Sequence, residues 1–214
     1  MTLLGRALED FLAGERQQSL SFLDAHGRVR GTMPVRRFFR GTTDFFAFDR
    51  LLLGRCRGDV LDLGAAAGSF SLALQDLRVQ VSAVDACPRA CGVMRRRGVR
   101  RVLEYDISRL VPTAQTLVLV MNTLGIFGTV QQLDNFLGRA SGCQRILLDA
   151  FAPAHGDVLE ECLCTQYRGE LGEPFGWLSV SSTLLAERAR RTGWRLEVLA
   201  REEHGAYAAE LTRV

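Results

Sequence analysis

Short apolar runs alternate along most of the chain with segments whose apolar positions repeat at helical spacing. Leu117-Val118-Leu119-Val120 is apolar throughout, as expected of a strand covered on both faces. The segments between such runs place apolar residues three or four positions apart, which is typical of helices with one buried face. Strands are predicted at 59–63, 79–84, 102–105, 116–121 and 145–149, and helices at 44–53, 69–76, 88–97 and 129–138. This alternation predicts an α/β domain with a mostly parallel, doubly wound sheet.

The C-terminal part of the chain has a different pattern. After a predicted helix at 182–191, residues 194–202 alternate between apolar and polar positions, His204-Gly205 turns the chain, and residues 206–214 alternate again. Two strands joined by so short a turn must be antiparallel. The sheet is therefore predicted to end in an antiparallel hairpin, whereas the sheet of a nicotinamide-dependent dehydrogenase is normally all parallel.

Residues 1–43 precede this pattern and are predicted to form an N-terminal appendage, with residues 44–214 as the main domain. A helix is predicted at 3–12, and two alternating segments between residues 19 and 35 flank an Asp-Ala-His-Gly turn, which predicts a β-hairpin. Residues 151–181 show little periodicity. A connection of that length in a compact domain is usually a lid or a substrate wall; an edge strand and turn covering the sheet is the alternative.

Composition limits the partners and the compartment. The 214 residues are enough for one full α/β core, and all 27 basic residues are arginine, yet the net charge is only +3, which does not favour nucleic acid as a partner. The N-terminus lacks the pattern of a signal peptide, and there is no apolar run of about 18 residues to span a membrane. The six cysteines form no C-x-x-C pair, so neither a metal site nor a disulfide framework is expected. We expect a cytoplasmic protein without membrane contact.

The chemistry is concentrated where the first strand of the main domain ends, at 60–68. This segment reads V-L-D-L-G-A-A-A-G and leads into an amphipathic helix. It is neither a G-x-G-x-x-G dinucleotide fingerprint nor a phosphate loop ending in G-K-S or G-K-T. An acid, Asp62, stands two residues before Gly64, where it would repel a pyrophosphate and suit a ligand with an ammonium group. An ordinary strand-to-helix turn without a ligand remains the alternative.

This segment resembles motif I of class I S-adenosylmethionine-dependent methyltransferases, D-x-G-x-G-x-G. Ala66 replaces the middle glycine, and its methyl group narrows the backbone approach to the cofactor. The resemblance covers residues 44–214, and the whole layout looks like a group of bacterial class I methyltransferases. It implies a seven-stranded, Rossmann-like sheet of order 3-2-1-4-5-7-6, transferase activity with S-adenosylmethionine as cofactor, and S-adenosylhomocysteine as product.

The expected cofactor-binding residues lie at the ends of successive strands. Asp85 follows Asp62 by 23 positions, a spacing that places an acid on ribose hydroxyls of either S-adenosylmethionine or a nicotinamide cofactor. The resemblance further implies that Asp106 faces the adenine amino group, that the Ile107 amide meets the ring, and that Asn122 lies beside the methyl group. The predicted cofactor site comprises Asp62, Gly64, Ala65, Ala66, Gly68, Asp85, Ala86, Asp106, Ile107 and Asn122.

The sequence contains fewer features that indicate the methyl acceptor. Residues 122–125 read N-T-L-G rather than N-P-P-Y, which disfavours amino-group methylation of bases or glutamine by that route. We expect a small-molecule acceptor in a pocket lined by Phe39, Arg40, Leu124, Tyr167 and Trp177. No catalytic base is identified, and His155 is only a weak candidate. A NAD-dependent oxidoreductase and a catalytically silent cofactor-binding module are the alternatives, and the oligomeric state is not determined.

Overall fold

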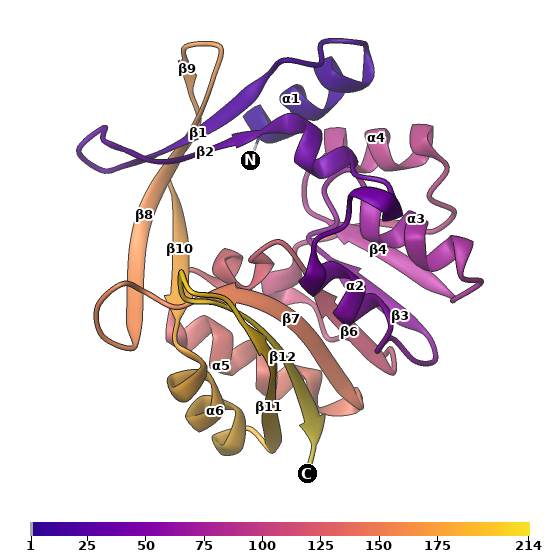
Figure 1. Cartoon of the computed structure of the whole chain (residues 1–214), viewed down its shortest axis with the longest axis vertical. Helices are drawn as coiled ribbons and strands as arrows, with labels where there is room; N and C mark the ends of the chain where they lie inside the picture. Colours follow the sequence, from indigo (N-terminus) through magenta and orange to yellow (C-terminus); the bar gives the residue numbers. More distant parts are fainter. Residues whose placement is uncertain (1) are drawn as a thin grey trace.

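A seven-stranded sheet forms the centre of the computed structural model, which describes residues 2–214 (Figure 1). Its order, β11-β12-β7-β6-β3-β4-β5, is the predicted order of the class I methyltransferase fold read from the opposite edge. Six strands run in the same direction, and β12 runs antiparallel to both of its neighbours, which confirms the predicted terminal hairpin. The strands are β3 (Val60–Leu63), β4 (Val81–Asp85), β5 (Val102–Glu104), β6 (Thr116–Leu119), β7 (Arg145–Phe151), β11 (Trp194–Arg201) and β12 (Ala206–Arg213).

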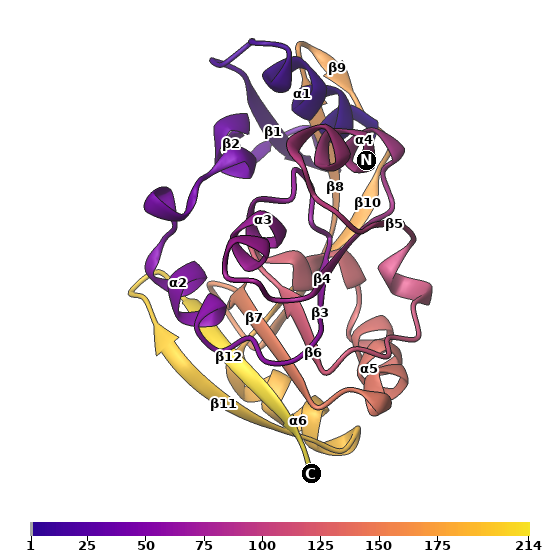
Figure 2. The ribbon, with the colours of Figure 1, turned by 90° about the vertical axis from the view of Figure 1, so that its right-hand side faces the viewer.

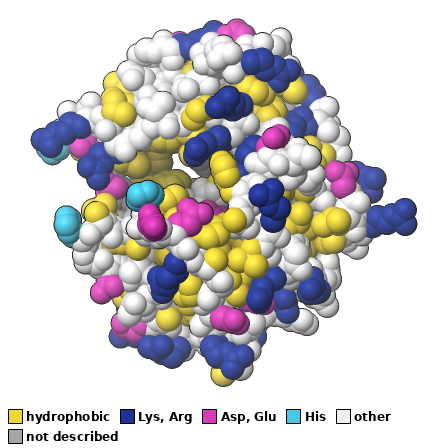
Figure 3. Space-filling model, in the orientation of Figure 1, with side chains coloured by type: hydrophobic (Ala, Val, Ile, Leu, Met, Phe, Trp, Pro, Cys, Tyr) yellow, Lys and Arg dark blue, Asp and Glu magenta, His cyan; other side chains and the backbone are white. Residues whose placement is uncertain are grey.

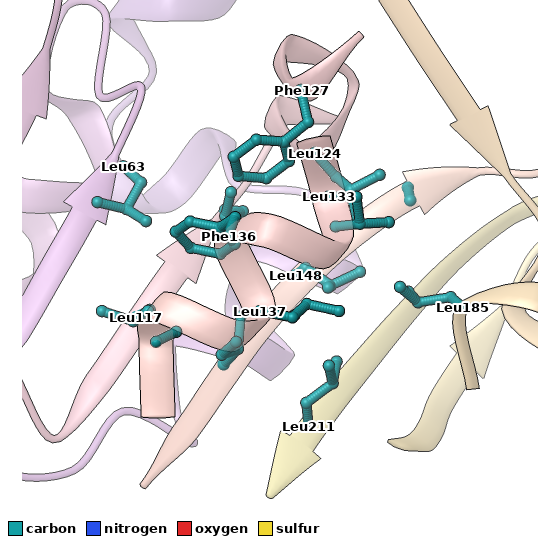
Figure 4. Packing of buried hydrophobic residues seen from close by; sticks show 14 of the residues in the cluster. Leu63, Leu117, Leu124, Phe127, Leu133, Phe136, Leu137, Leu148, Leu185 and Leu211 are labelled. Carbon is teal, nitrogen blue, oxygen red and sulfur yellow. The ribbon is translucent and has the colours of Figure 1, made fainter. Parts of the chain in front are cut away.

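Helices cover both faces of this sheet because alternate strand residues point to opposite sides. Leu117 and Leu148 pack against α5 and α6 in the largest apolar cluster (Figure 4), whereas Val118 and Leu147 pack against α2 and α3. The helix α4 lies beside α3 and contributes Met94 to a smaller cluster. The helices are α1 (Thr2–Leu12), α2 (Ala47–Leu53), α3 (Ser69–Asp76), α4 (Pro88–Arg97), α5 (Val130–Arg139) and α6 (Ser182–Arg191).

Short 3-10 turns link several elements. One of them precedes α2, whose first residue differs from the one that the sequence pattern predicted. The helix expected from Asp44 begins at Ala47, because Asp49 accepts a hydrogen bond from the Phe46 backbone N–H at 2.8 Å and caps the helix from inside its first turn. Asp44 instead ends a 3-10 turn. The turns are η1 (Val35–Phe39), η2 (Thr42–Asp44), η3 (Ile107–Arg109), η4 (Thr123–Phe127) and η5 (Ala140–Gly142).

A second, antiparallel sheet joins two segments that are far apart in the sequence. The expected N-terminal hairpin, β1 (Ser19–Asp24) and β2 (Val29–Pro34), pairs with β8 (Val158–Tyr167), which in turn pairs with β10 (Phe175–Val180) and the short β9 (Glu170–Leu171). Figure 1 shows the indigo hairpin lying beside the orange β8. Residues 151–181 are therefore largely strands and not an irregular wall. Because β1 and β8 pair, this sheet contains segments from both sides of residue 43. The division of the chain into an appendage and a main domain at that residue remains a prediction.

Two contacts attach the antiparallel sheet to the main body. On one side α1 packs against α4 and β8, with the Tyr167 hydroxyl donating to Asp10 at 2.9 Å and Arg89 paired with Glu9. On the other side β10 packs against η4. The sheet thus spans the carboxyl ends of the central strands, and Figure 2 shows it above β3 and β4. Among residues 2–214, no helix is long and apolar enough to cross a membrane.

Candidate functional site

The turn after β3 has a left-handed backbone at three positions, with φ of +69° at Gly64, +50° at Ala66 and +76° at Gly68. A Cβ on Gly64 would lie 2.6 Å from Thr123 Cγ2, and one on Gly68 would lie 2.7 Å from Val99 Cγ2. Both glycines are therefore required by conformation and by space. The turn brings backbone amides to the carboxyl end of the sheet, where open α/β sheets bind ligands.

Asp85, the last residue of β4, is held against this turn by both carboxylate oxygens. Its Oδ2 accepts a hydrogen bond from the Ala66 N–H at 2.9 Å, and its Oδ1 accepts one from the Cys87 N–H at 2.8 Å. Burial raises its pKa, and these two hydrogen bonds oppose the shift. Each carboxylate oxygen can accept more than one hydrogen bond, so Asp85 retains acceptor capacity toward a ligand beside the exposed Ala86.

Asp62 lies within β3 and is 1% exposed. Its Oδ2 accepts a hydrogen bond from the Ser71 hydroxyl at 2.6 Å, whereas its Oδ1 is the one buried side-chain oxygen or nitrogen without a hydrogen-bond partner in the described chain. Burial raises the pKa of Asp62 to about 6, the Ser71 bonds lower it, and the negative charge of Asp85 raises it further. A buried acceptor without a partner costs free energy, so a cationic donor at this position would stabilise the site.

The alanine at the middle position of the turn is expected to be strained. Since left-handed φ costs a residue with a Cβ roughly 1–2 kcal/mol, Ala66→Gly should raise the free energy of unfolding by about 0.5–1 kcal/mol. Ala65→Gly in the same turn, where φ is not left-handed, should lower it by a similar amount because only chain entropy changes. Urea unfolding of the two variants measures this difference. Equal losses in both would show that Ala66 carries no strain.

The end of β5 carries two more of the predicted cofactor residues. Asp106 is exposed and accepts a hydrogen bond from the Ser108 N–H at 2.9 Å, which caps η3. Ile107 is buried, and its side chain joins the cluster around α5. Asp106 is therefore exposed to solvent after the edge strand β5, whereas Asp62 and Asp85 are buried.

The end of β6 is shaped by an acid that sequence reasoning missed. Met121 and Asn122 both have left-handed φ, 60° and 59°, and their N–H groups donate to the two oxygens of Asp149 at 2.6 and 3.1 Å. In return, Asn122 Oδ1 accepts a hydrogen bond from the Phe151 N–H at 3.4 Å. Burial raises the pKa of Asp149 to about 7, and the charge of Asp49 contributes to the rise. The available signal was its position near the end of a predicted strand, which it shares with Asp85 and Asp106.

Three of the predicted substrate-pocket residues lie in the interior. Leu124 is 1% exposed within the largest apolar cluster, and Tyr167 is 1% exposed beneath α1. Arg40 is paired through both terminal nitrogens with Asp49, and its guanidinium lies over the Phe46 ring at 4.6 Å. Packing and pairing occupy these side chains, so any influence they have on an acceptor is indirect.

Phe39 and Trp177 are half-buried and lie on different sides of the site. Phe39 stacks on Phe11 with ring centroids 4.4 Å apart, at the N-terminal side. Trp177, on β10, lies so close to Gly125 that a Cβ there would be 2.3 Å from Trp177 Cε2. The indole therefore packs directly on η4, just beyond Asn122. The structure brings Trp177, but not Phe39, to the end of β6.

The molecule is hollowed between its two sheets, as the space-filling view shows, with arginines above the opening and acidic and histidine side chains below it (Figure 3). A separate depression of about 250 Å³ lies at the amino ends of β3 and β4 and includes Val60 and Ser82. It lies at the opposite end of the strands from the glycine turn, so we assign the site to the hollow. No group of three or more potential metal ligands occurs within the described part of the chain.

No family model matches the chain, and no curated protein matches it. A solved structure of a SAM-dependent methyltransferase from Bacteroides fragilis, in complex with S-adenosyl-L-homocysteine, matches 100% of this chain and 95% of its own with 26% identity and a TM-score of 0.88. The CcbJ methyltransferase from Streptomyces caelestis matches 78% of this chain and 88% of its own with 14% identity and a TM-score of 0.60. An S-adenosylmethionine-dependent methyltransferase from Clostridium acetobutylicum matches 80% and 93% with 11% identity and a TM-score of 0.61. The last two likenesses concern the fold alone.

Proposed function

We propose that this chain is an S-adenosylmethionine-dependent methyltransferase that acts on a small molecule entering the hollow between its two sheets. The observation that carries the proposal is the likeness over the whole chain, N-terminal hairpin included, to a methyltransferase with bound S-adenosylhomocysteine. The antiparallel β12 also distinguishes this sheet from the all-parallel sheet of NAD-dependent dehydrogenases.

The residues at the strand ends fit this cofactor. The unpartnered Oδ1 of Asp62 provides an acceptor for the ammonium group of the methionine part. Asp85, which ends β4 beside the glycine turn, is expected to accept hydrogen bonds from ribose hydroxyls, and Asp106 and Ile107 are expected to border the adenine. When bound, the cofactor supplies an electrophilic methyl group on a good leaving group. The protein's contribution is then mainly to position the acceptor and exclude water.

A small acceptor agrees with the charge and the enclosure of the hollow. The net charge of +3 is too low to indicate a nucleic-acid surface. The antiparallel sheet covers the carboxyl ends of the central strands and leaves an opening between the sheets (Figure 3). We therefore favour a metabolite-sized acceptor over a macromolecule.

Calorimetry tests the proposed function directly. Purified protein should bind S-adenosylhomocysteine and S-adenosylmethionine and should not bind NAD. Affinity should also fall as the pH drops below about 6, because protonation removes the charge of Asp62 that the ammonium group requires. Absence of S-adenosylhomocysteine binding at neutral pH would refute the proposal, and binding of NAD alone would favour an oxidoreductase.

A further inference from the structure

Asp149 is the strand-end acid for which the proposed cofactor contacts give no role. It lies on the face of the central sheet that packs against α2, as Leu147 does two residues earlier. Its two oxygens hold the left-handed turn at Met121 and Asn122, and this turn leads into η4, on which Trp177 packs. The carboxylate therefore lies where the ends of β6 and β7 meet, beside the turn that leads into η4.

Within residues 2–214, no positively charged side chain forms an ion pair with the Asp149 carboxylate. The facing acid on α2, Asp49, is paired with Arg40, so that pair is neutral overall. The strands β6 and β10 and the turn η4 carry no titratable side chains. On β12, the Tyr207 hydroxyl donates to the Val180 carbonyl oxygen, and Glu210 is paired with two arginines. When ionised, Asp149 thus carries an uncompensated negative charge in a largely buried position.

We propose that Asp149 faces the methyl group to be transferred and accepts a proton from the acceptor, and that the acceptor is an amine. This inference rests on the proposed function. In the step, one N–H bond of the acceptor ammonium breaks and its proton passes to the Asp149 carboxylate. The freed nitrogen lone pair then forms the new N–C bond. The methyl–sulfur bond breaks with its electron pair left on sulfur, giving the neutral thioether and a methylated ammonium product.

The surroundings of Asp149 favour an ammonium group over a hydroxyl group. A cation beside Asp149 would neutralise the uncompensated charge, whereas a neutral alcohol would not. The half-buried Trp177 packs on η4, which directly follows the turn held by Asp149. Phe175 lies edge-on to Trp177 at 6.1 Å between ring centroids, and aromatic faces attract cations. A pKa of about 7 for Asp149 also suits a group that takes and returns a proton near neutral pH.

Sinefungin tests this inference without knowledge of the acceptor. In this cofactor analogue a carbon bearing an ammonium group replaces the methyl-bearing sulfur, so it places a cation at the methyl position, whereas S-adenosylhomocysteine is neutral there. At about pH 8, wild-type protein should bind sinefungin roughly tenfold more tightly than S-adenosylhomocysteine. Near pH 5.5 the ratio should approach one, because Asp149 is then protonated. Titration of Asp62 cancels from the ratio, since both ligands share the amino acid end.

Two variants separate a local effect from a general one. Asp149→Asn should bring the ratio close to one at both pH values. Asp106→Asn, a change at the expected adenine position, should weaken both ligands equally and leave the ratio unchanged. A wild-type ratio that does not change with pH, or an Asp149→Asn ratio equal to that of wild type, would overturn the inference while leaving the proposed function intact. If wild-type protein binds neither ligand, both fail. If Asp149→Asn does not fold, the wild-type pH series decides alone.

Discussion

Asp85→Ala is expected to weaken the binding of S-adenosylhomocysteine by at least about tenfold, because hydrogen bonds to a charged acceptor contribute roughly 1.5–3 kcal/mol each. Asp85 is expected to have two roles. We propose that it accepts hydrogen bonds from the ribose hydroxyls, and in the structure it holds the glycine turn through the Ala66 N–H. Its removal should therefore affect both the ligand contact and the shape of the turn. Calorimetry on protein whose fold is verified by circular dichroism measures the effect.

Adenosine separates the role of Asp85 from that of Asp62. It contains the ribose but lacks the amino acid end, so its binding should be lost in Asp85→Ala and largely kept in Asp62→Ala. Asp62 is expected to act mainly through the glycine turn and through the methionine ammonium group, for which its Oδ1 has no competing partner in the described chain. Equal loss of adenosine in both variants, with both folded, would contradict this placement of the cofactor along the strand ends.

Asp49→Ala is expected to lower the free energy of unfolding by roughly 3–5 kcal/mol, because it leaves the buried Arg40 guanidinium without its counter-ion. Both side chains are only 8% exposed, and Asp49 also caps α2 through the Phe46 N–H. The pair joins the segment after β2 to the helix that precedes the glycine turn. Chemical denaturation followed by fluorescence provides the measurement.

Two further variants identify the cause of that loss. The double variant Arg40→Met with Asp49→Leu should recover most of the stability, since apolar residues of similar volume can replace a buried ion pair. Glu170→Ala removes the partner of Arg6 in an exposed pair and should leave the unfolding midpoint nearly unchanged. A double variant as unstable as Asp49→Ala alone would show that the helix cap, and not the unpaired charge, accounts for the loss.

The sequence alone determined which segments form the central strands and the glycine turn, because these depend mainly on interactions that are local in the chain, whereas the strand order was implied by the family resemblance. Apolar runs such as residues 117–120 require cover on both faces, and the short turn at His204-Gly205 requires antiparallel strands. The spacing of Asp62, Gly64 and Asp85 placed two acids and a glycine at adjacent strand ends, and the structure has them there. The geometry of a strand–turn–helix backbone is sufficient to predict these three positions.

Tertiary structure alone decided how the site is enclosed and which side chains face it. Pairing of β1 with β8 brings together segments about 140 positions apart, and no local feature of the sequence specifies a pairing over that distance. Arg40, Leu124 and Tyr167 lie in the interior because partners from distant segments, such as Asp10 for Tyr167, occupy them. Asp149 acts on Met121 and Asn122 across neighbouring strands. A side chain's direction and pKa depend on neighbours that only the folded chain brings within contact distance.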